Sequence, residues 1–280
     1  MRVQAAALLS ALCLVSASPA PNYPGFKTVW SDGFAGRAGE IPNGGLWKTI
    51  TNLRVNNEVQ DYTTSNQNLQ LSGGGTVQLV PRKSGGKWTS GRIESQQAFT
   101  PQPGKVTMVE SVIRFGDNPR DRKQGIWPAF WLLGESIRHG TPWPQCGELD
   151  IMETINGGPT AYGTVHCGTP QGGPCNEPAG RPSTIHLGDN GWHRWTIKFD
   201  RTSSDWRSES IQWLVDGNVY NTLRGADIND QGVWGTIAHS PLFIILNVAV
   251  GGNWPGAPNG NTGDSWGSMM EAEYVAVYSN

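Results

Sequence analysis

Three carboxylates lie within one short segment of the chain, residues 146–157, which reads CGELDIMETING. Glu148 and Asp150 are two positions apart, so their side chains would share one face of a β-strand. Regular alternation would place Met152 next on that face and would turn Glu153 to the opposite one. Glu153 is therefore either a surface charge or a residue of an irregular strand.

Two carboxyl groups on one face are what cleavage of a glycosidic bond requires. One protonates the leaving oxygen, and the other attacks the anomeric carbon or activates water. A β-bulge adds one residue and moves every later side chain to the opposite face. A bulge at Ile151 or Met152 would place all three carboxylates on one face. We then expect Glu148 and Asp150 to titrate as a coupled pair, and their charges to raise the pKa of Glu153.

Solvated strand faces often carry acidic residues at similar spacing, so the neighbouring sequence has to decide between the two interpretations. Trp127, Trp131 and Trp143 precede the segment, and GTVH, which ends at His166, follows it as a candidate neighbouring strand. An exposed acidic strand seldom lies between aromatic segments, so the pattern favours an active site.

The first twenty residues have the pattern of a secretory signal peptide. Their one basic residue is Arg2, a long apolar run follows, and small residues precede a predicted cleavage between residues 17 and 20. We expect residues 21–280 to form one catalytic domain that is secreted to the extracellular space or the cell wall.

Charge and hydropathy argue against two classes of partner. The net charge is -2, only 16% of the residues are charged, and no run of Lys or Arg occurs, so nucleic acid and anionic membranes are not expected partners. No other apolar run approaches the ~20 residues of a membrane helix. We expect a monomer that binds a polysaccharide or oligosaccharide.

The chain predicts an all-β fold. Short runs rich in Val, Ile, Thr and aromatic residues alternate with turn residues, and helical periodicity is almost absent. Asp216 and Gly217 separate two such runs and predict a type I′ hairpin turn. Helical turns are expected near 119–124 and 226–231. Strands are expected at 55–62, 76–80, 91–99, 105–115, 126–133, 147–154, 161–167, 193–199, 209–215, 218–223, 242–250 and 271–278.

Tryptophan and cysteine support a secreted sugar-binding protein. The 13 tryptophans exceed the needs of one core and indicate stacking platforms for sugars. Cys13 lies in the signal peptide. The short loop between Cys167 and Cys175 favours a disulfide between them and leaves Cys146 free, and the alternative is a pair of Cys146 with Cys167.

Several motifs, taken in order, resemble the laminarinase-type members of glycoside hydrolase family sixteen. They are NNEVQDYT (56–63), TSGRIES (89–95), GIWPAFWLLG (125–134), CGELDIMETING (146–157), GTVH (163–166) and LNVAVGGNWPG (246–256). The resemblance implies a single-domain jelly-roll sandwich of two curved antiparallel sheets with a concave substrate cleft. It also implies a retaining mechanism, with Glu148 as nucleophile, Asp150 as the residue that orients it, and Glu153 as general acid/base.

An open cleft binds sugars through aromatic stacking and hydrogen bonds. Trp127 and Trp131 share a strand face, and Trp127 is the better cleft candidate, whereas Trp131 is a second platform or a core residue. His166 is expected to hydrogen-bond a catalytic group or a sugar rather than a metal, since no second histidine has ligand spacing.

Five further residues are expected in contact with substrate or beside it, three of them from the resemblance and two from a glycine-rich loop. Asn57, Glu58 and Arg92 match positions that reach sugar hydroxyls, and the alternative is turn polarity and a surface ion pair. Asn253 and Trp254 lie in a glycine-flanked loop that could approach substrate or could pack on the protein.

A structural calcium ion is found in many members of this family. Here Gly33 stands where an acidic residue is usual, and Glu273 stands where aspartate is usual. With one ligand lost and another lengthened, these positions argue against calcium, and we expect no cofactor.

The leading interpretation is a secreted endo-acting hydrolase of β-1,3 linkages in β-glucan, including mixed 1,3/1,4 chains. Alternatives on the same scaffold are hydrolysis of β-1,3-galactan and wall-remodelling transglycosylation. A third alternative, from another class, is a non-catalytic lectin-like module. The carboxylate trio argues against a lectin, because clustered charges cost free energy to desolvate.

Overall fold

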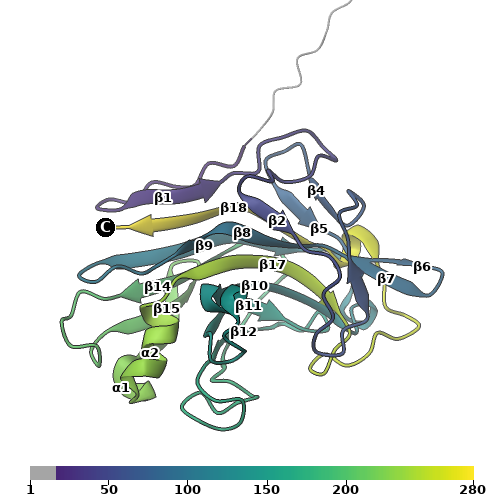
Figure 1. The fold of residues 1–280 in the computed structure, drawn as a ribbon. Helices are drawn as coiled ribbons and strands as arrows, with labels where there is room; N and C mark the ends of the chain where they lie inside the picture. Colours follow the sequence, from purple (N-terminus) through teal and green to yellow (C-terminus); the bar gives the residue numbers. More distant parts are fainter. Residues whose placement is uncertain (1–16) are drawn as a thin grey trace, which may run out of the picture.

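The computed structural model describes residues 17–280, which form two large β-sheets packed face to face (Figure 1). Most of the predicted signal peptide lies outside this range, and so does Cys13, so the cleavage site stays a prediction. Within the described residues, no helix combines the length and the hydropathy needed to span a membrane.

The convex sheet has eight strands, in the order β16-β15-β14-β9-β18-β5-β4, with β1 also paired to β18. Its strands are β1 (Lys27–Asp32), β4 (Leu69–Leu71), β5 (Val77–Leu79), β9 (Val106–Phe115), β14 (His193–Asp200), β15 (Ser210–Val215), β16 (Asn218–Arg224) and β18 (Met270–Ser279).

The concave sheet has seven strands, in the order β13-β12-β11-β10-β17-β8-β2. Its strands are β2 (Trp47–Thr49), β8 (Arg92–Phe99), β10 (Ile126–Gly134), β11 (Glu148–Thr154), β12 (Thr160–His166), β13 (Ser183–His186) and β17 (Leu242–Val250). All pairings within both large sheets are antiparallel. This arrangement confirms the predicted all-β fold of two packed sheets.

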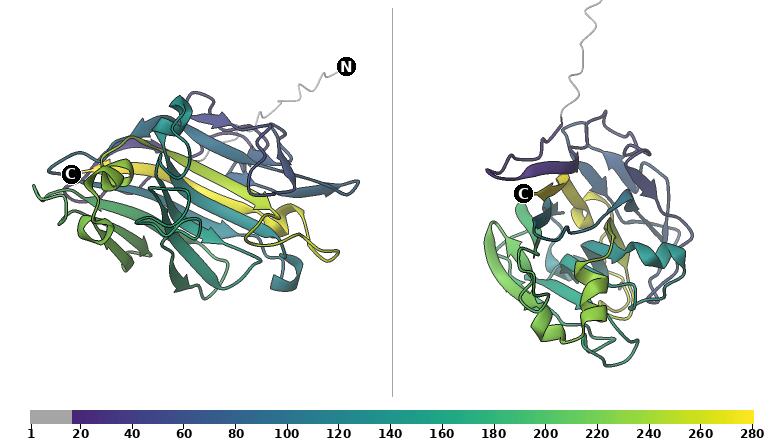
Figure 2. Two further views of the ribbon diagram at one scale, coloured as in Figure 1. Left: turned by 60° about the horizontal axis from the view of Figure 1, so that its bottom comes forward. Right: turned by 60° about the vertical axis from the view of Figure 1, so that its left-hand side comes forward.

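A small third sheet lies at one end of the sandwich. It contains β3 (Gln60–Tyr62), β6 (Arg82–Ser84) and β7 (Lys87–Ser90), and β3 runs parallel to β7. The short helices α1 (Gly225–Ile228) and α2 (Gln231–Ala238) lie at the opposite end, beside β14 and β15 (Figures 1 and 2). Strands of both sheets bow in the same direction, so the outer surface of the seven-stranded sheet is concave.

The core lies between the sheets and contains much of the aromatic surplus. Trp47, Trp195, Trp213 and Trp234 are completely or almost completely buried. Other tryptophans, among them Trp143 and Trp254, keep large exposed surfaces. The tryptophan content therefore serves both the core and the surface.

Each of the twelve expected strand ranges overlaps a strand of the structure. The expected range 55–62 was wrong at its start, because the strand begins only at Gln60. Asn56 and Asn57 have φ values of 52° and 57°, and this left-handed backbone forms a turn that cannot belong to a regular strand. The prediction of a type I′ turn is confirmed, since φ is positive at both Asp216 and Gly217.

Six strands, one α-helix and two 3₁₀ helices (Glu135–His139 and Ser265–Ser268) were not predicted. The strands β1, β2, β4, β6, β7 and β13 have three to six residues each, too few to establish an alternating pattern. Helix α2 reads QGVWGTIA, which contains two glycines and several β-branched residues. It is stabilised at its start by Asp230, whose side chain accepts a hydrogen bond from the backbone N–H of Val233.

Glu209, at the start of β15, connects this strand to α2. Its buried carboxylate accepts hydrogen bonds from Arg201 Nε at 3.0 Å and from Trp234 Nε1 at 2.7 Å. His239 Nε2 lies 2.5 Å from the same group. Burial would raise the pKa of the Glu209 carboxyl, but the three contacts outweigh it and lower the pKa.

We predict that Glu209→Gln destabilises the protein at neutral pH by about 3 kcal/mol, because it leaves a buried arginine without its charge partner. A lowered pKa contributes its full stability above the ordinary pKa of about 4.5, and this is lost as the pH falls through the lower pKa of the folded state. The difference between variant and wild type should therefore shrink as the pH falls below about 4.5. Urea unfolding at pH 7 and at about pH 3 measures both effects.

Asp61→Asn is the control, since the ion pair of Asp61 with Arg54 is exposed on both sides. Equal unfolding midpoints for Glu209→Gln and wild type at pH 7 would show that the contacts of the Glu209 carboxylate do not stabilise the fold.

Candidate active site

The three carboxylates lie on β11 and share its concave face. Glu148 stands opposite His166 on β12, whereas Glu153 stands opposite Tyr162, and the register shifts between Asp150 and Glu153. His166 and Tyr162 are an even number of residues apart on a regular strand, so they share a face. The strand is therefore bulged as predicted, and Glu153 is turned to the side of Glu148.

The pairing with β10 identifies the extra residue. Asp150 stands opposite Trp131 and Met152 stands opposite Phe130, so Ile151 has no partner on that strand. Met152 is fully buried in the core between the sheets. A regular strand would instead have placed Met152 on the concave face and Glu153 in the core.

Burial raises the pKa of every carboxyl in the trio. The pKa of Glu148 is raised to about 8, first by desolvation and then by the charge of Glu153, while Arg92 acts in the opposite direction. For Asp150, desolvation and then the charges of Glu153 and Glu148 raise the pKa well above its usual range. The charge of Glu148 thus affects the titration of Asp150, as expected for a coupled pair.

The pKa of Glu153 is raised to about 7, first by desolvation, and a hydrogen bond from Trp127 partly offsets this. The charge repulsion between Glu148 and Glu153 that raises the pKa of Glu148 acts on both carboxyls. The indole Nε1 of Trp127 donates to Glu153 Oε1 at 2.8 Å. Trp127 therefore lies in the site, as predicted, but it contacts a carboxylate directly.

Trp254 completes an aromatic wall beside Glu153. Its ring meets Trp127 edge to face at 5.5 Å between centroids, and Tyr162 in the same way at 4.9 Å. Because 41% of the Trp254 surface stays exposed, the ring is available to a ligand. Tyr162 was not among the predicted site residues. It lies four positions before His166 on the expected strand 161–167, so strand alternation alone would have placed both side chains on one face.

Asn57 and Asn253 join the two loops at this end of the site. The Nδ2 group of Asn57 donates to Asn253 Oδ1 at 2.7 Å, and the backbone N–H of Asn253 donates to the carbonyl of Asn56 at 2.8 Å. Both predicted residues therefore lie together near Trp254, and both are exposed.

At the end of the site away from Trp254, three polar residues lie in a row, namely Asp150, His166 and Glu177. His166 Nε2 lies 3.7 Å from Asp150 Oδ2, and His166 Nδ1 lies 2.8 Å from Glu177 Oε2. Glu177 also accepts a hydrogen bond from the backbone N–H of Cys167 at 2.9 Å. His166 therefore lies beside the carboxylate trio and is oriented by a buried glutamate. At 3.7 Å it does not make the expected hydrogen bond to a catalytic group, and a hydrogen bond to a sugar stays a prediction.

Glu177 was missed because it lies in the irregular segment after Cys175. The structure joins Cys167 to Cys175, which confirms the predicted disulfide, and Cys146 is free and buried. The disulfide loop brings Glu177 back beneath His166, and no local sequence pattern indicates that contact.

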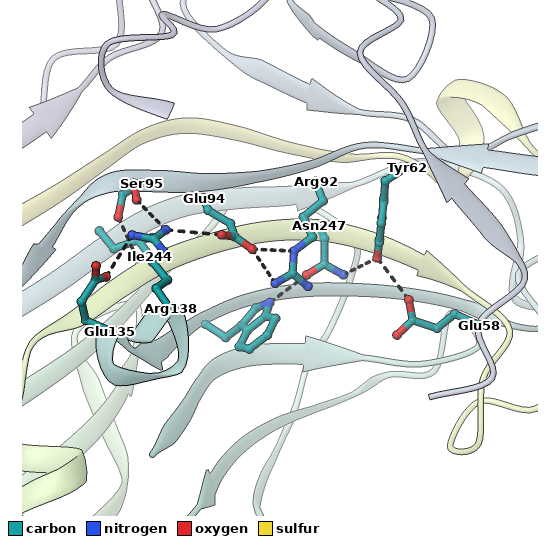
Figure 3. A network of polar contacts seen from close by, with 10 residues as sticks. Glu58, Tyr62, Arg92, Glu94, Ser95, Glu135, Arg138, Ile244 and Asn247 are labelled. Atoms are coloured by element: carbon teal, nitrogen blue, oxygen red, sulfur yellow. Dashed lines mark hydrogen bonds and ion pairs between the residues drawn. The ribbon is translucent and has the colours of Figure 1, made fainter. Parts of the chain in front are cut away.

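Arg92 and Glu94 begin a polar network along the concave face (Figure 3). Arg92 Nη2 lies 2.8 Å from Glu94 Oε1, and Arg138 Nη2 lies 3.3 Å from Glu94 Oε2. Arg138 also pairs with Glu135 at 2.9 Å. Arg92 therefore forms an ion pair, as the alternative interpretation expected, but the pair with Glu94 is buried and does not lie on the surface.

The network continues through Asn247 to Glu58 (Figure 3). Trp131 Nε1 donates to Asn247 Oδ1 at 2.7 Å, and Asn247 Nδ2 donates to the hydroxyl of Tyr62 at 3.2 Å. The Tyr62 hydroxyl lies 3.4 Å from Glu58 Oε2. The guanidinium of Arg92 stacks over the Trp131 ring at 4.9 Å, so Trp131 lies on the concave face and is half-buried there.

A cavity of about 330 Å³ lies elsewhere, where Arg120, Lys123 and Asp189 contribute to its lining. Asp189 is the only carboxylate among its lining residues. Acid/base chemistry that requires two carboxyl groups is therefore placed on the open concave face instead.

Among the described residues, one group could bring three ligands to a metal ion. It consists of Glu148, Asp150 and His166, whose ligand atoms lie within 4.8 Å of one another. These are residues of the carboxylate trio and its histidine, so this group coincides with the candidate catalytic centre.

The residues expected at the family's calcium site supply few ligands for that ion. Gly33 has no side chain, and Ser18, whose carbonyl oxygen would lie 2.5 Å from a Cβ there, falls within the range of the predicted cleavage. Asp32 already accepts hydrogen bonds on both oxygens, from the N–H of Phe34 at 2.9 Å and from Trp47 Nε1 at 2.8 Å.

Comparison with known proteins places this fold and site in a family. The model of glycosyl hydrolases family 16 matches residues 55–275. The chain belongs to that family. Its resemblance to family 16 in sequence motifs is thereby confirmed.

Individual family 16 relatives cover most of the chain. An endo-1,3-beta-glucanase structure from Streptomyces sioyaensis has a TM-score of 0.87 and 36% identity, over 94% of this chain and 99% of that one. The clotting factor G alpha subunit of Tachypleus tridentatus is 30% identical over 92% of this chain. A beta-glucanase of Rhodothermus marinus is 28% identical over 91% of this chain and 86% of its own length. The chain spans only 34% of the clotting factor subunit.

We predict that Trp127→Phe raises the pKa of Glu153, because the indole donor that stabilises the ionised carboxylate is lost while the apolar surroundings remain. A ¹³C-detected titration of the Glu153 side chain measures this directly. Trp192→Phe serves as control, since Trp192 is exposed and stacks against Arg114 of the convex sheet. An unchanged or lower pKa in Trp127→Phe would contradict the assignment of the hydrogen bond.

Proposed function

We propose that this protein is a secreted, retaining endo-glycosidase that hydrolyses internal β-1,3 linkages of β-glucan of the laminarin type, including mixed 1,3/1,4 chains. The observation that carries the proposal is the bulge at Ile151, which places Glu148 and Glu153 on one face in a family 16 chain. The glucanase names of several relatives support the choice of substrate.

Glu148 is proposed as the nucleophile and Glu153 as the general acid/base. In the first step Glu148 attacks the anomeric carbon while Glu153 gives its proton to the leaving oxygen, which forms a covalent glycosyl-enzyme. In the second step Glu153 removes a proton from water, whose oxygen attacks the same carbon and releases Glu148. Two inversions at one carbon retain its configuration. A pKa of about 7 suits Glu153 to both roles.

Asp150 is proposed to keep Glu148 ionised. Burial and the charges of Glu153 and Glu148 raise the pKa of Asp150 well above its usual range, which favours its protonated form, and its buried Oδ2 atom has no hydrogen-bond partner in the protein. Glu148 and Asp150 have oxygen atoms within 4.8 Å. A protonated Asp150 can therefore turn to donate a hydrogen bond to Glu148, which stabilises the charge that attack requires.

Endo action is supported by exposed rings on both sides of the carboxylates. Trp143 packs against His166 near Glu148, whereas Trp254 lies near Glu153, and both rings are more than a third exposed. Sugars can stack on both, so a chain can extend in both directions from the cleaved bond. The polar residues Glu58, Arg92 and Asn247 lie along the same face and suit sugar hydroxyls.

We predict that Glu148→Gln lowers the release of reducing sugar from laminarin by at least about a thousandfold, because the amide cannot attack the anomeric carbon. Binding of laminarin should persist in affinity electrophoresis. Glu40→Gln, which alters an exposed side chain before β2, should match wild type.

Parallel assays on lichenan and β-1,3-galactan separate the alternatives. Release from galactan alone would replace the glucan assignment, and elongated products at high oligosaccharide concentration would identify a transglycosylase. Binding without release from any of the three polymers would leave the lectin-like module as the function and would contradict hydrolysis.

We propose that the protein is a monomer that needs no metal ion for folding or for reaction, since the two carboxyls supply the acid and the nucleophile. Dialysis against EDTA should then leave both the melting temperature and the rate on laminarin unchanged. A fall in melting temperature that calcium restores would contradict this, and a fall in rate alone would indicate a metal at the catalytic group.

A further inference from the structure

The bulge in β11 interrupts the regular register of the sheet. Bulged residues lose regular ladder hydrogen bonds, and a buried carbonyl without a partner is costly. Two carbonyls at the bulge accept hydrogen bonds from side chains of the opposite sheet. The indole Nε1 of Trp213 donates to the carbonyl of Asp150 at 2.7 Å, and the hydroxyl of Tyr220 lies 3.4 Å from the carbonyl of Ile151.

A glycine makes room for both rings. Gly163 on β12 lies between the partners of Asp150 and Glu153, so it stands opposite the bulge. A Cβ atom at Gly163 would lie 2.5 Å from the Tyr220 hydroxyl and 2.6 Å from a ring carbon of Trp213. Any other residue at this position would therefore push the rings away from the bulge.

A second irregularity in the convex sheet matches the first. Between β15 and β16, Trp213 stands opposite Asn221 and Leu214 stands opposite Val219, so Tyr220 is an extra residue without a partner. Tyr220 packs against the core between the sheets. The two bulges thus face each other across the sandwich, and the second supplies a donor to the first.

The hydrogen bond from Trp213 to the bulge is not needed merely to satisfy a buried indole N–H in this core. Trp195 lies on the adjacent strand β14 and is equally buried, yet its Nε1 has no hydrogen-bond partner. The core of this sheet therefore accommodates an unpaired indole. Trp195 provides a matched comparison in which a tryptophan fills the core without contacting the bulge.

We propose that Trp213 and Tyr220 are positioning residues that hold the β11 bulge in register and thereby aim Glu153 at the glycosidic oxygen. This inference rests on the proposed role of Glu153 as general acid/base. Loss of the donors removes these hydrogen bonds from the carbonyls of Asp150 and Ile151, so the bulge relaxes and the carboxyl of Glu153 moves relative to Glu148. Small displacements of a catalytic group lower the rate greatly.

The test compares Trp213→Phe with Trp195→Phe on two substrates. One is laminarin, and the other is a laminaribioside with a dinitrophenolate leaving group, which departs without protonation. In Trp213→Phe we expect kcat on laminarin to fall at least about tenfold with KM within about twofold of wild type. The kcat/KM for the dinitrophenyl substrate should fall less than about threefold, because its first step needs no acid.

Azide provides a second readout. It attacks the glycosyl-enzyme without giving up a proton, so it displaces Glu148 without help from Glu153. Azide should therefore accelerate turnover of the dinitrophenyl substrate by Trp213→Phe and yield the β-glycosyl azide. Trp195→Phe should show neither the leaving-group dependence nor the azide effect, even if its melting temperature falls.

Tyr220→Phe keeps the inference testable if Trp213→Phe does not fold, since it removes only a hydroxyl. It should show the same pattern with a smaller loss, about threefold on laminarin, because its contact is longer. Equal losses on both substrates in either variant, or the same pattern in Trp195→Phe, would overturn the positioning role alone. Wild type that is inactive on both substrates would overturn the proposed function and this inference together.

Discussion

A β-strand presents every second side chain to one face, and the chemistry proposed for this protein depends on one departure from that rule. Ile151 is the extra residue that turns Glu153 to the side of Glu148. The opposite sheet supplies hydrogen-bond donors to two carbonyls at this bulge, and Gly163 leaves space for the rings that carry them. A local irregularity of β11 is thus supported by both layers of the sandwich.

The same packing decides the protonation of the site. Burial raises the pKa of Glu148 and of Glu153, so neither is fixed in its ionised form near neutral pH. Arg92 and Trp127 act in the opposite direction, through charge and through a hydrogen bond. Both carboxyls therefore exchange protons near neutral pH, and a hydrogen bond from a protonated Asp150, as proposed, would give Glu148 the charge that a retaining mechanism requires.

Much of the fold was predictable because long strands buried on one or both faces leave a strong pattern. Each expected strand range overlaps an observed strand, and the hairpin turn at Asp216 and Gly217 is confirmed. Short edge strands such as β6 and β13 were missed, since three or four residues carry no periodicity. Helix α2 was missed because the packing of Trp234 and the cap at Asp230 outweigh its weak propensity.

The sequence by itself determined the spacing of Glu148, Asp150 and Glu153. Because strand side chains alternate every second residue, this spacing already required a bulge if all three carboxylates were to share one face. Only the tertiary structure decided that Ile151 is the extra residue, that Glu177 supports His166, and which side chains reach the bulge from the other sheet. Strand alternation is a local property of consecutive residues. Contacts between strands far apart in the chain depend on how the two sheets pack, and no short pattern records that.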